Sequence, residues 1–298
     1  MSRLVPVFGI LSLVTAAFPC AAVVATPASG PAGGKAELAR MADARVNLKE
    51  SFQRATAVRR AAATVGLAQA RQLTKGIASA IASFSHTLPG FEARLSNLTG
   101  APSAVRNQRG ALTAAAPGKR SEDIVRAFLA QHGDLYGLTA ADLNDLVALG
   151  DSPGGSSGLR MLRMEQQIDG RPVFQSETRF LLDRDGRLMT SLGLMVPQAR
   201  SFAPKIDATR LLSPQAAVVR LLSAEGKTAD PAAFTLASGN ADFSGRLVLD
   251  ENDDYVAGPI AARQVLFPLA PGLLVPAWSL VVFTTGDADW YAMVDAET

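Results

Sequence analysis

Two Asp-Gly dipeptides divide residues 159–196 into three segments in which apolar and polar side chains alternate. Alternation with a period of two is typical of half-buried strands, because successive side chains point to opposite faces of a sheet. Asp169-Gly170 and Asp185-Gly186 tolerate the positive φ angles that tight hairpin turns need. The stretch therefore predicts an antiparallel meander with strands at Leu159–Ile168, Pro172–Leu182 and Arg187–Leu194.

A helical pattern and a hairpin-sized unit precede this meander. Phe91 and Arg94-Leu95, followed by a turn at Leu98–Pro102, have the size of a hairpin. A helix is expected to begin at Ser121-Glu122-Asp123, where acidic residues suit the first turn, and to end near Gly133. A second, short helix is expected at Ala140–Leu143.

The last hundred residues repeat the order of helix and then strands. Ser213 can cap a helix over Gln215–Glu225 that has Pro214 at its first position and closes at Gly226. Lys227–Val256 is polar and favours only weak strands. Three stronger strands are expected at Arg263–Leu269, Leu273–Phe283 and Trp290–Asp295.

Helices followed by antiparallel strands indicate an α+β fold and argue against a parallel βαβ sheet. We expect two small modules, residues 88–200 and 201–298, each an antiparallel sheet with a helix packed on one face. The length of 298 residues and an apolar fraction of 48% suffice to bury a core in each.

The first 25 residues have the order of an export signal. Met1-Ser2-Arg3 is positively charged, Leu4–Ala25 is uncharged and mostly apolar, and small residues precede a cleavage site after Ala25. Cys20-Ala21-Ala22 offers an alternative site. Prolines within this stretch disfavour a membrane-spanning helix. We expect residues 1–25 to be cleaved, with no stable membrane insertion and a secreted or periplasmic product.

A linker and a basic helix follow the signal. Residues 26–34 are rich in Pro and Gly and predict a linker. Residues 35–84 place apolar side chains at steps of three and four with arginines between them, which favours an amphipathic helix broken at Gly66 and Gly76. We therefore expect residues 26–87 to form an extension in front of the two modules.

The net charge of +2 hides a strong asymmetry between the two parts of the chain. Residues 1–120 hold 15 basic and 4 acidic side chains, whereas residues 121–298 hold 14 and 23. Because the basic residues are scattered and few aromatics lie among them, we expect no nucleic-acid partner. A solvated basic helix, or one docked on the chain's own acidic half, is favoured.

The residues that usually carry catalysis are scarce. One cysteine excludes an internal disulfide framework, and two histidines, His86 and His132, leave few candidates for a general base. His132 is expected on the exposed side of a helix end and His86 in a Ser/Thr context, so both are predicted to be solvated. The sequence contains no H-E-x-x-H motif, P-loop or dinucleotide fingerprint.

Two partial motifs are interpreted as loops. Gly154–Gly158 fits G-x-S-x-G, but a nucleophile elbow needs a following helix and a later histidine, and Ser156 has neither. Asp250, Asn252 and Asp254 fit positions 1, 3 and 5 of a calcium loop, yet Tyr255 replaces the required glycine and Ala261 the final glutamate. A surface acidic loop is favoured, with weak calcium binding as the alternative. No catalytic, cofactor-binding or metal-ligating residue is assigned.

Several segments resemble the pro-region of fungalysin-type peptidases. The hairpin Arg163–Phe174 resembles the fungalysin/thermolysin propeptide (FTP) module. Its Gln166, Gly170 and Pro172-Val173-Phe174 have the spacing of that module's R-x-x-Q-x-x-x-G-x-P-V-F pattern. The resemblance extends over about residues 88–298 and includes Phe91–Pro102, Ile124–Leu129, Leu135–Leu138, Asp142-Leu143 and Leu182–Leu188, with Pro276–Val282 and Trp290–Thr298 similar to a PepSY-like module.

The resemblance implies the propeptide of a secreted fungalysin-like zinc metalloendopeptidase. Such a pro-region assists folding of the catalytic domain and inhibits it until processing, so the expected partner is a metallopeptidase catalytic domain. The family normally continues into a domain bearing H-E-x-x-H, and zinc is expected only there. The chain then resembles a truncated precursor, here without its own enzyme activity.

Alternative functions stay open at this point. A stand-alone exported protein that inhibits or binds other peptidases is the main alternative, and a fragment of a thermolysin-type precursor is a weaker one. The acidic part, residues 121–298, and an open hairpin edge near Pro172 are expected to dock the partner.

Overall fold

The computed structural model describes residues 26–27, 57–96, 99–237, 247–251, 253–270, 272–285 and 289–297. The predicted export signal, most of the linker and the first part of the predicted basic helix lie outside these residues. The chain divides into two compact units, which are described separately. The larger unit holds residues 57–208 and 264–277, and the smaller unit holds residues 209–263 and 278–297 together with residues 26–27, as far as they are described. Helices and antiparallel sheets make up the described chain, which confirms the α+β class.

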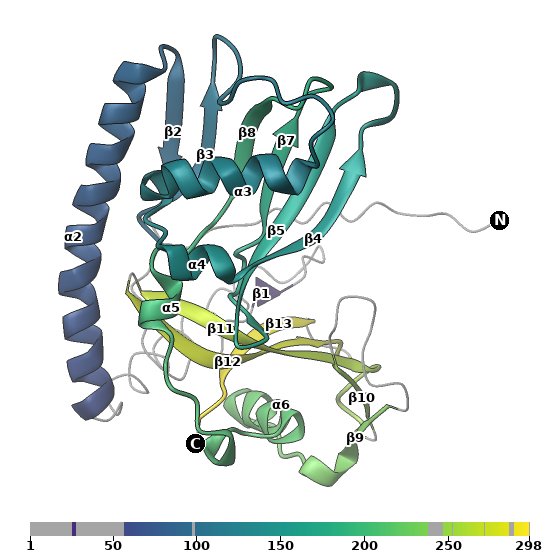
Figure 1. Cartoon of the computed structure of the whole chain (residues 1–298). Helices are drawn as coiled ribbons and strands as arrows, with labels where there is room; N and C mark the ends of the chain where they lie inside the picture. The colour runs from purple at the N-terminus through teal and green to yellow at the C-terminus, as the bar shows by residue number, and fades with distance from the viewer. Residues whose placement is uncertain are drawn as a thin grey trace, which may run out of the picture. The chain divides into compact units, whose positions relative to one another are not determined.

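An antiparallel sheet of order β2-β3-β8-β7-β5-β4 forms the larger unit (Figure 1). Its strands are β2 (Phe91–Leu95), β3 (Pro102–Asn107), β4 (Leu146–Pro153), β5 (Arg160–Ile168), β7 (Thr178–Leu182) and β8 (Leu188–Gly193), and the short β6 (Arg171–Pro172) pairs with β5. Its helices are α2 (Ala57–Thr87), α3 (Ser121–His132), η1 (Gly133–Tyr136), α4 (Ala140–Asn144), η2 (Gly155–Ser157) and α5 (Ala199–Phe202). The meander was predicted, whereas β4 and the joining of β3 to β8 were not.

Helix α3 covers one face of this sheet (Figure 1). Its side chains Val125, Phe128 and Leu129 pack with Phe180 and Val105 of the strands in a continuous buried cluster. The helix begins at Ser121 and ends at His132, as expected from the sequence. Because side chains alternate along a strand, the residues between these buried ones point to the opposite face, away from α3.

Helix α2 is continuous, so the predicted breaks at Gly66 and Gly76 are wrong. A Cβ atom at Gly76 would meet no heavy atom within 4 Å, so this glycine costs the helix only its propensity, about 1 kcal/mol. The packing of the next residue offsets this cost. Ile77 is buried against Gly137, so closely that a Cβ atom added to Gly137 would lie 2.9 Å from Cδ1 of Ile77.

The predicted strand Pro172–Leu182 is interrupted. Strand β6 ends at Pro172, Gln175 has a φ of 56°, and pairing resumes only at Thr178. Between these points the backbone N–H of Phe174 donates to the carbonyl of Leu266 at 2.9 Å, and Val173 forms a parallel bridge with Leu266. The edge that was expected to be open near Pro172 is therefore occupied, and that prediction is wrong.

Apolar packing explains why residues 264–277 belong to the larger unit and not with the rest of the predicted module 201–298. Leu266 and Leu274 form a buried cluster with Ile168, Val173 and Val196. Arg171 adds a hydrogen bond from its Nε to Oε1 of Gln264 at 2.8 Å.

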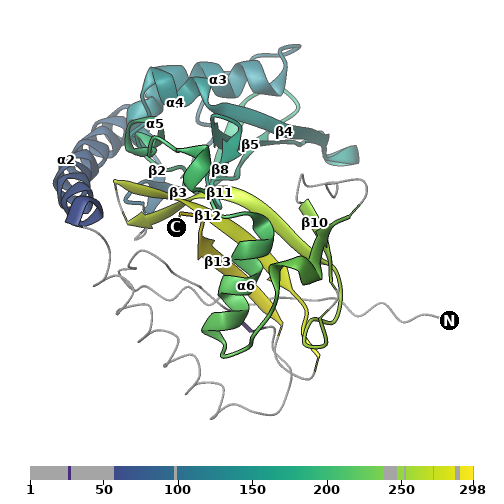
Figure 2. The ribbon, with the colours of Figure 1, turned by 90° about the horizontal axis from the view of Figure 1, so that it is seen from below.

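A second antiparallel sheet, of order β1-β13-β12-β11-β10-β9, belongs to the smaller unit (Figure 2). Its strands are β1 (Thr26–Pro27), β9 (Phe234–Leu236), β10 (Leu247–Glu251), β11 (Ile260–Ala270), β12 (Leu273–Val282) and β13 (Trp290–Asp295). The C-terminal part of β11 and the N-terminal part of β12 belong to the larger unit. The helical elements are η3 (Ala208–Arg210), α6 (Pro214–Ala224) and η4 (Pro231–Ala233).

Helix α6 lies on this sheet and follows the sequence closely. Ser213 Oγ accepts from the N–H of Ala216 at 3.1 Å, and Pro214 is the first helical residue. Gly226, with a φ of 73°, follows the end of the helix. The buried face of α6, which includes Val218 and Leu221, packs with Leu280 and Val294 of the strands. Among the described helices of the chain, none is long and apolar enough to cross a bilayer.

Candidate functional site

The G-x-S-x-G segment forms the turn between β4 and β5, as predicted. Residues 155–157 make one exposed helical turn, η2, and Ser157 Oγ donates to the carbonyl of Gly154 at 2.7 Å. The strand β5 follows instead of a helix, so Ser156 lacks the geometry of a nucleophile elbow.

The acidic loop Asp250–Asp254 is only partly described. Asp250 lies in β10, and Asn252 falls outside the described residues. No three potential metal-ligating side chains gather in the part of the chain that the structure describes. Weak calcium binding at this loop stays a prediction.

The two histidines differ. His86 is exposed near the end of α2, in agreement with its expected solvation. His132 was also expected to be solvated, but its ring lies against Phe84 of α2, at 4.7 Å between centroids, and Phe128 of α3, at 5.3 Å. Burial lowers the pKa of His132, and the nearby Asp134 opposes this shift. The exposed position assigned from the helical pattern is wrong because α2 covers this end of α3.

We predict that acid weakens the larger unit through His132. Because its pKa is lower in the folded than in the unfolded chain, the unfolded chain binds the proton more readily. The His132 contribution to the free energy of unfolding is complete above the unfolded pKa of about 6.5 and decreases as the pH falls through that value. Urea unfolding at pH 7.5 and 5.5 should show this loss in the wild type and in His86→Phe, but a smaller one in His132→Phe. An equal loss in all three proteins contradicts the prediction.

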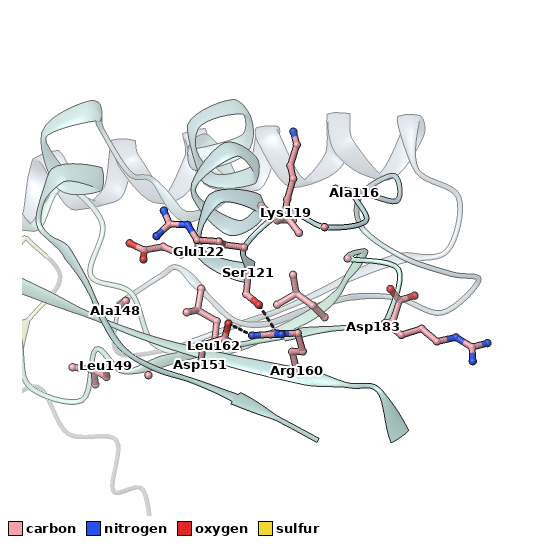
Figure 3. A pocket seen from close by; sticks show the side chains of 17 residues that line it. Ala116, Lys119, Ser121, Glu122, Ala148, Leu149, Asp151, Arg160, Leu162 and Asp183 are labelled. Atoms are coloured by element: carbon pink, nitrogen blue, oxygen red, sulfur yellow. Dashed lines mark hydrogen bonds and ion pairs between the residues drawn. The ribbon is translucent and has the colours of Figure 1, made fainter. Parts of the chain in front are cut away.

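A groove of about 640 Å³ opens where α3 begins, beside β4, β5 and β7 (Figure 3). Ser121, which was expected only to start the helix, is buried here and does not cap it. Its Oγ accepts from Nε of Arg160 at 3.1 Å, and Nη2 of Arg160 donates to Oδ2 of Asp151 at 2.7 Å. Burial acts to raise the pKa of Asp151, but hydrogen bonds from Arg160 and Ser121 outweigh it and hold this pKa below its usual value.

This Ser-Arg-Asp arrangement lacks a base strong enough to activate the serine. A guanidinium donates hydrogen bonds, accepts none and stays protonated, so Arg160 cannot remove the proton of Ser121. Asp151 can accept a hydrogen bond, but a carboxylate whose pKa is held below its usual value is a weak base. The three side chains connect the start of α3 to β4 and β5. We assign them a structural role.

A charged cluster at the end of β5 is likewise internally satisfied. Arg200 donates from Nη1 to Oδ1 of Asp169 and from Nε to Oδ2 of Asp145, each at 2.7 Å, and its Nη2 also contacts Asp145. Its backbone N–H donates to Asp142, whose other carboxylate oxygen accepts from the capping residue Thr139. Hydrogen bonds to Asp145 and then Asp169 raise the pKa of Arg200 further. The cluster ties α5 to α4 and to the Asp169-Gly170 turn.

The sheet face opposite α3 is different, because it is exposed and mixes apolar and charged side chains. We call it the open face. By the strand register it comprises Glu92 and Arg94 (β2), Ala104 and Arg106 (β3), Thr190 and Leu192 (β8), Arg179 and Leu181 (β7), and Met161 and Arg163 (β5). Leu192 is 51% exposed although its strand is central in the sheet. The solvated face of an antiparallel sheet normally carries polar residues, so an exposed leucine on a central strand makes this face a candidate for a binding surface.

A hollow of about 620 Å³ lies in this face beside Leu192. Its lining includes Ala104, whose small side chain leaves room between Leu192 and Arg94, its partners across neighbouring strands. Arg106 also lines the hollow and pairs with Glu92 at 2.7 Å. The sequence alternation had predicted outward-pointing side chains in the meander, but the addition of β2 and β3 to the sheet, which brings these residues together, was not predicted.

Comparison with known proteins assigns no family. No protein-family model matches the sequence, and no curated protein matches it significantly. Functional assignment therefore depends on the residues themselves.

Proposed function

We propose that this chain is the propeptide region of a secreted fungalysin-like zinc metalloendopeptidase. Its role is to assist folding of the peptidase catalytic domain and to inhibit that domain until processing. Zinc belongs to the catalytic domain, and no residue of this chain is assigned to it. The proposal commits to a protein-binding role, in which a broad surface acts without catalytic chemistry.

The observation that carries the proposal is the hairpin Arg163–Phe174, on which the family resemblance depends. Gln166 is fully buried, and its amide accepts from the N–H and donates to the carbonyl of Val196. Gly170 has a φ of 76° in the turn, and Val173 is fully buried against the 264–277 segment. These buried residues stabilise the folded module. Contact with a partner would then be made by surface residues, as expected of a protein that acts as a folding template.

Co-refolding tests the proposal directly. A fungalysin-type catalytic domain from the same organism is denatured and then refolded alone, with the chain from residue 26, or with an unrelated α+β protein of similar charge. We expect recovery of peptidase activity to rise only with this chain, after the added chain has been removed by proteolysis or affinity capture. The folded catalytic domain should in turn be inhibited by added chain, without rapid cleavage of the inhibitor.

The strength of inhibition separates cis from trans action. A covalently attached propeptide acts at an effective concentration of the order of millimolar, which a free chain lacks. We therefore expect partial inhibition in trans and tighter inhibition when the chain is fused ahead of the catalytic domain. Inhibition of several unrelated metallopeptidases, with no effect on refolding, would favour the alternative of a stand-alone exported inhibitor. No effect on either activity or refolding contradicts both functions.

A further inference from the structure

We infer that the open face of the larger unit, around Leu192 and Arg94, docks an acidic and partly apolar surface of the peptidase catalytic domain. This inference rests on the proposed function and adds to it the position and chemistry of the contact.

The exposed apolar area of the open face is not confined to one side chain. Leu192 lies between Ala104 and Arg179 across the neighbouring strands, and Leu181 and Met161, which pair with each other, are only partly buried. Together with the hollow beside Ala104 they offer an apolar contact framed by arginines. Arginine is enriched in protein interfaces because its guanidinium binds carboxylates in a planar, bidentate geometry.

The charge of the face determines what fits it. Arg94, Arg106, Arg163 and Arg179 lie on it. The carboxylates that face them are the exposed Glu92, which pairs with Arg106, and the partly exposed Glu177. Glu177 is shared by Arg179, at 3.0 Å, and Arg163, at 3.8 Å.

Arg94 has no ion pair within the described residues, and Glu165, also on this face by register, is buried and accepts from the amide of Gln167. The accessible charge is thus positive, which complements an acidic partner. If the open faces of two copies met, arginines would oppose arginines, and like charges across an interface cost binding free energy.

Charge and shape variants test the inference in the full chain from residue 26. Binding to the folded catalytic domain is measured by biolayer interferometry for Arg94→Glu and Leu192→Asp. Matched controls are Arg71→Glu, at an exposed position of α2, and Leu236→Asp on β9, whose leucine is 48% exposed. All variants are first checked for wild-type circular dichroism and unfolding midpoint.

We expect Arg94→Glu and Leu192→Asp each to weaken binding about tenfold or more and the controls to stay within about twofold. Association of the wild type should also slow as salt is raised, and more so than that of Arg94→Glu. Unchanged binding by both open-face variants, or equal loss in the controls, overturns the inference while leaving the proposed function standing.

Two further results have separate meanings. If the wild-type chain neither binds nor inhibits the catalytic domain, the proposed function fails and the inference fails with it. If the wild type is a dimer in light scattering and Leu192→Asp is a monomer, the open face binds a second copy, which also overturns the inference.

Discussion

Replacing Gly193 with alanine is expected to destabilise the larger unit more than any other single substitution considered for this chain. Gly193 has a φ of 141°, which side-chain-bearing residues rarely adopt, and it pairs with Thr178 across β7 and β8. An added Cβ would lie 2.3 Å from the carbonyl oxygen of Glu177 and 2.6 Å from Cα of Thr178. Both are backbone atoms and cannot rotate away. Backbone strain and steric overlap together should lower the free energy of unfolding by more than about 4 kcal/mol, a loss that few single substitutions cause.

The measurement is the urea midpoint of the full chain, followed by far-UV circular dichroism, because both tryptophans lie in the smaller unit and do not report on the larger one. Gly76→Ala is the matched control, because nothing lies within 4 Å of its Cβ position and the residue is helical. That variant should gain about 0.5–1 kcal/mol in the free energy of unfolding. A Gly193→Ala protein with a wild-type midpoint would contradict the strand pairing described for β7 and β8.

Removing the amide of Gln166 is expected to cost the larger unit about 2–4 kcal/mol, because it leaves two buried backbone groups without a partner. Val196 is 6% exposed, and its N–H donates to Oε1 of Gln166 at 2.7 Å while its carbonyl accepts from Nε2 at 3.0 Å. Gln166→Met keeps the length of the side chain, so the loss reports the hydrogen bonds rather than a cavity.

The neighbouring Gln167→Met is the control. Gln167 is only partly buried, and its amide donates to the carboxylate of Glu165. We expect that substitution to change the free energy of unfolding by less than about 1 kcal/mol. At urea concentrations where it is still folded, Gln166→Met should inhibit the catalytic domain as the wild type does, because Gln166 has no exposed surface for a partner. Loss of inhibition by the folded variant would instead place Gln166 in the contact.

The sequence alone was sufficient where the signal is local. Helix α6 has its capping hydroxyl, its first-turn proline and its closing glycine within one short segment, and the structure uses all three as expected. The same holds for the turn at Asp169-Gly170, where both residues have positive φ. The physical reason is that caps and tight turns are stabilised by hydrogen bonds and backbone angles within a few residues.

Tertiary structure decided the features that carry the proposals. The 264–277 segment pairs with Val173 through contacts about ninety residues apart, and this pairing closed an edge that the proline pattern had suggested was open. His132 is covered by Phe84 from another helix, and Leu192 is joined to Arg94 through a strand pairing that was not predicted. Alternation along one strand determines which side chains share a face, but which strands become neighbours depends on apolar burial summed over the whole unit. For that reason β5 and β8 of the meander were predictable from their residues, whereas the open face was recognisable only once β2 and β3 had been placed beside β8.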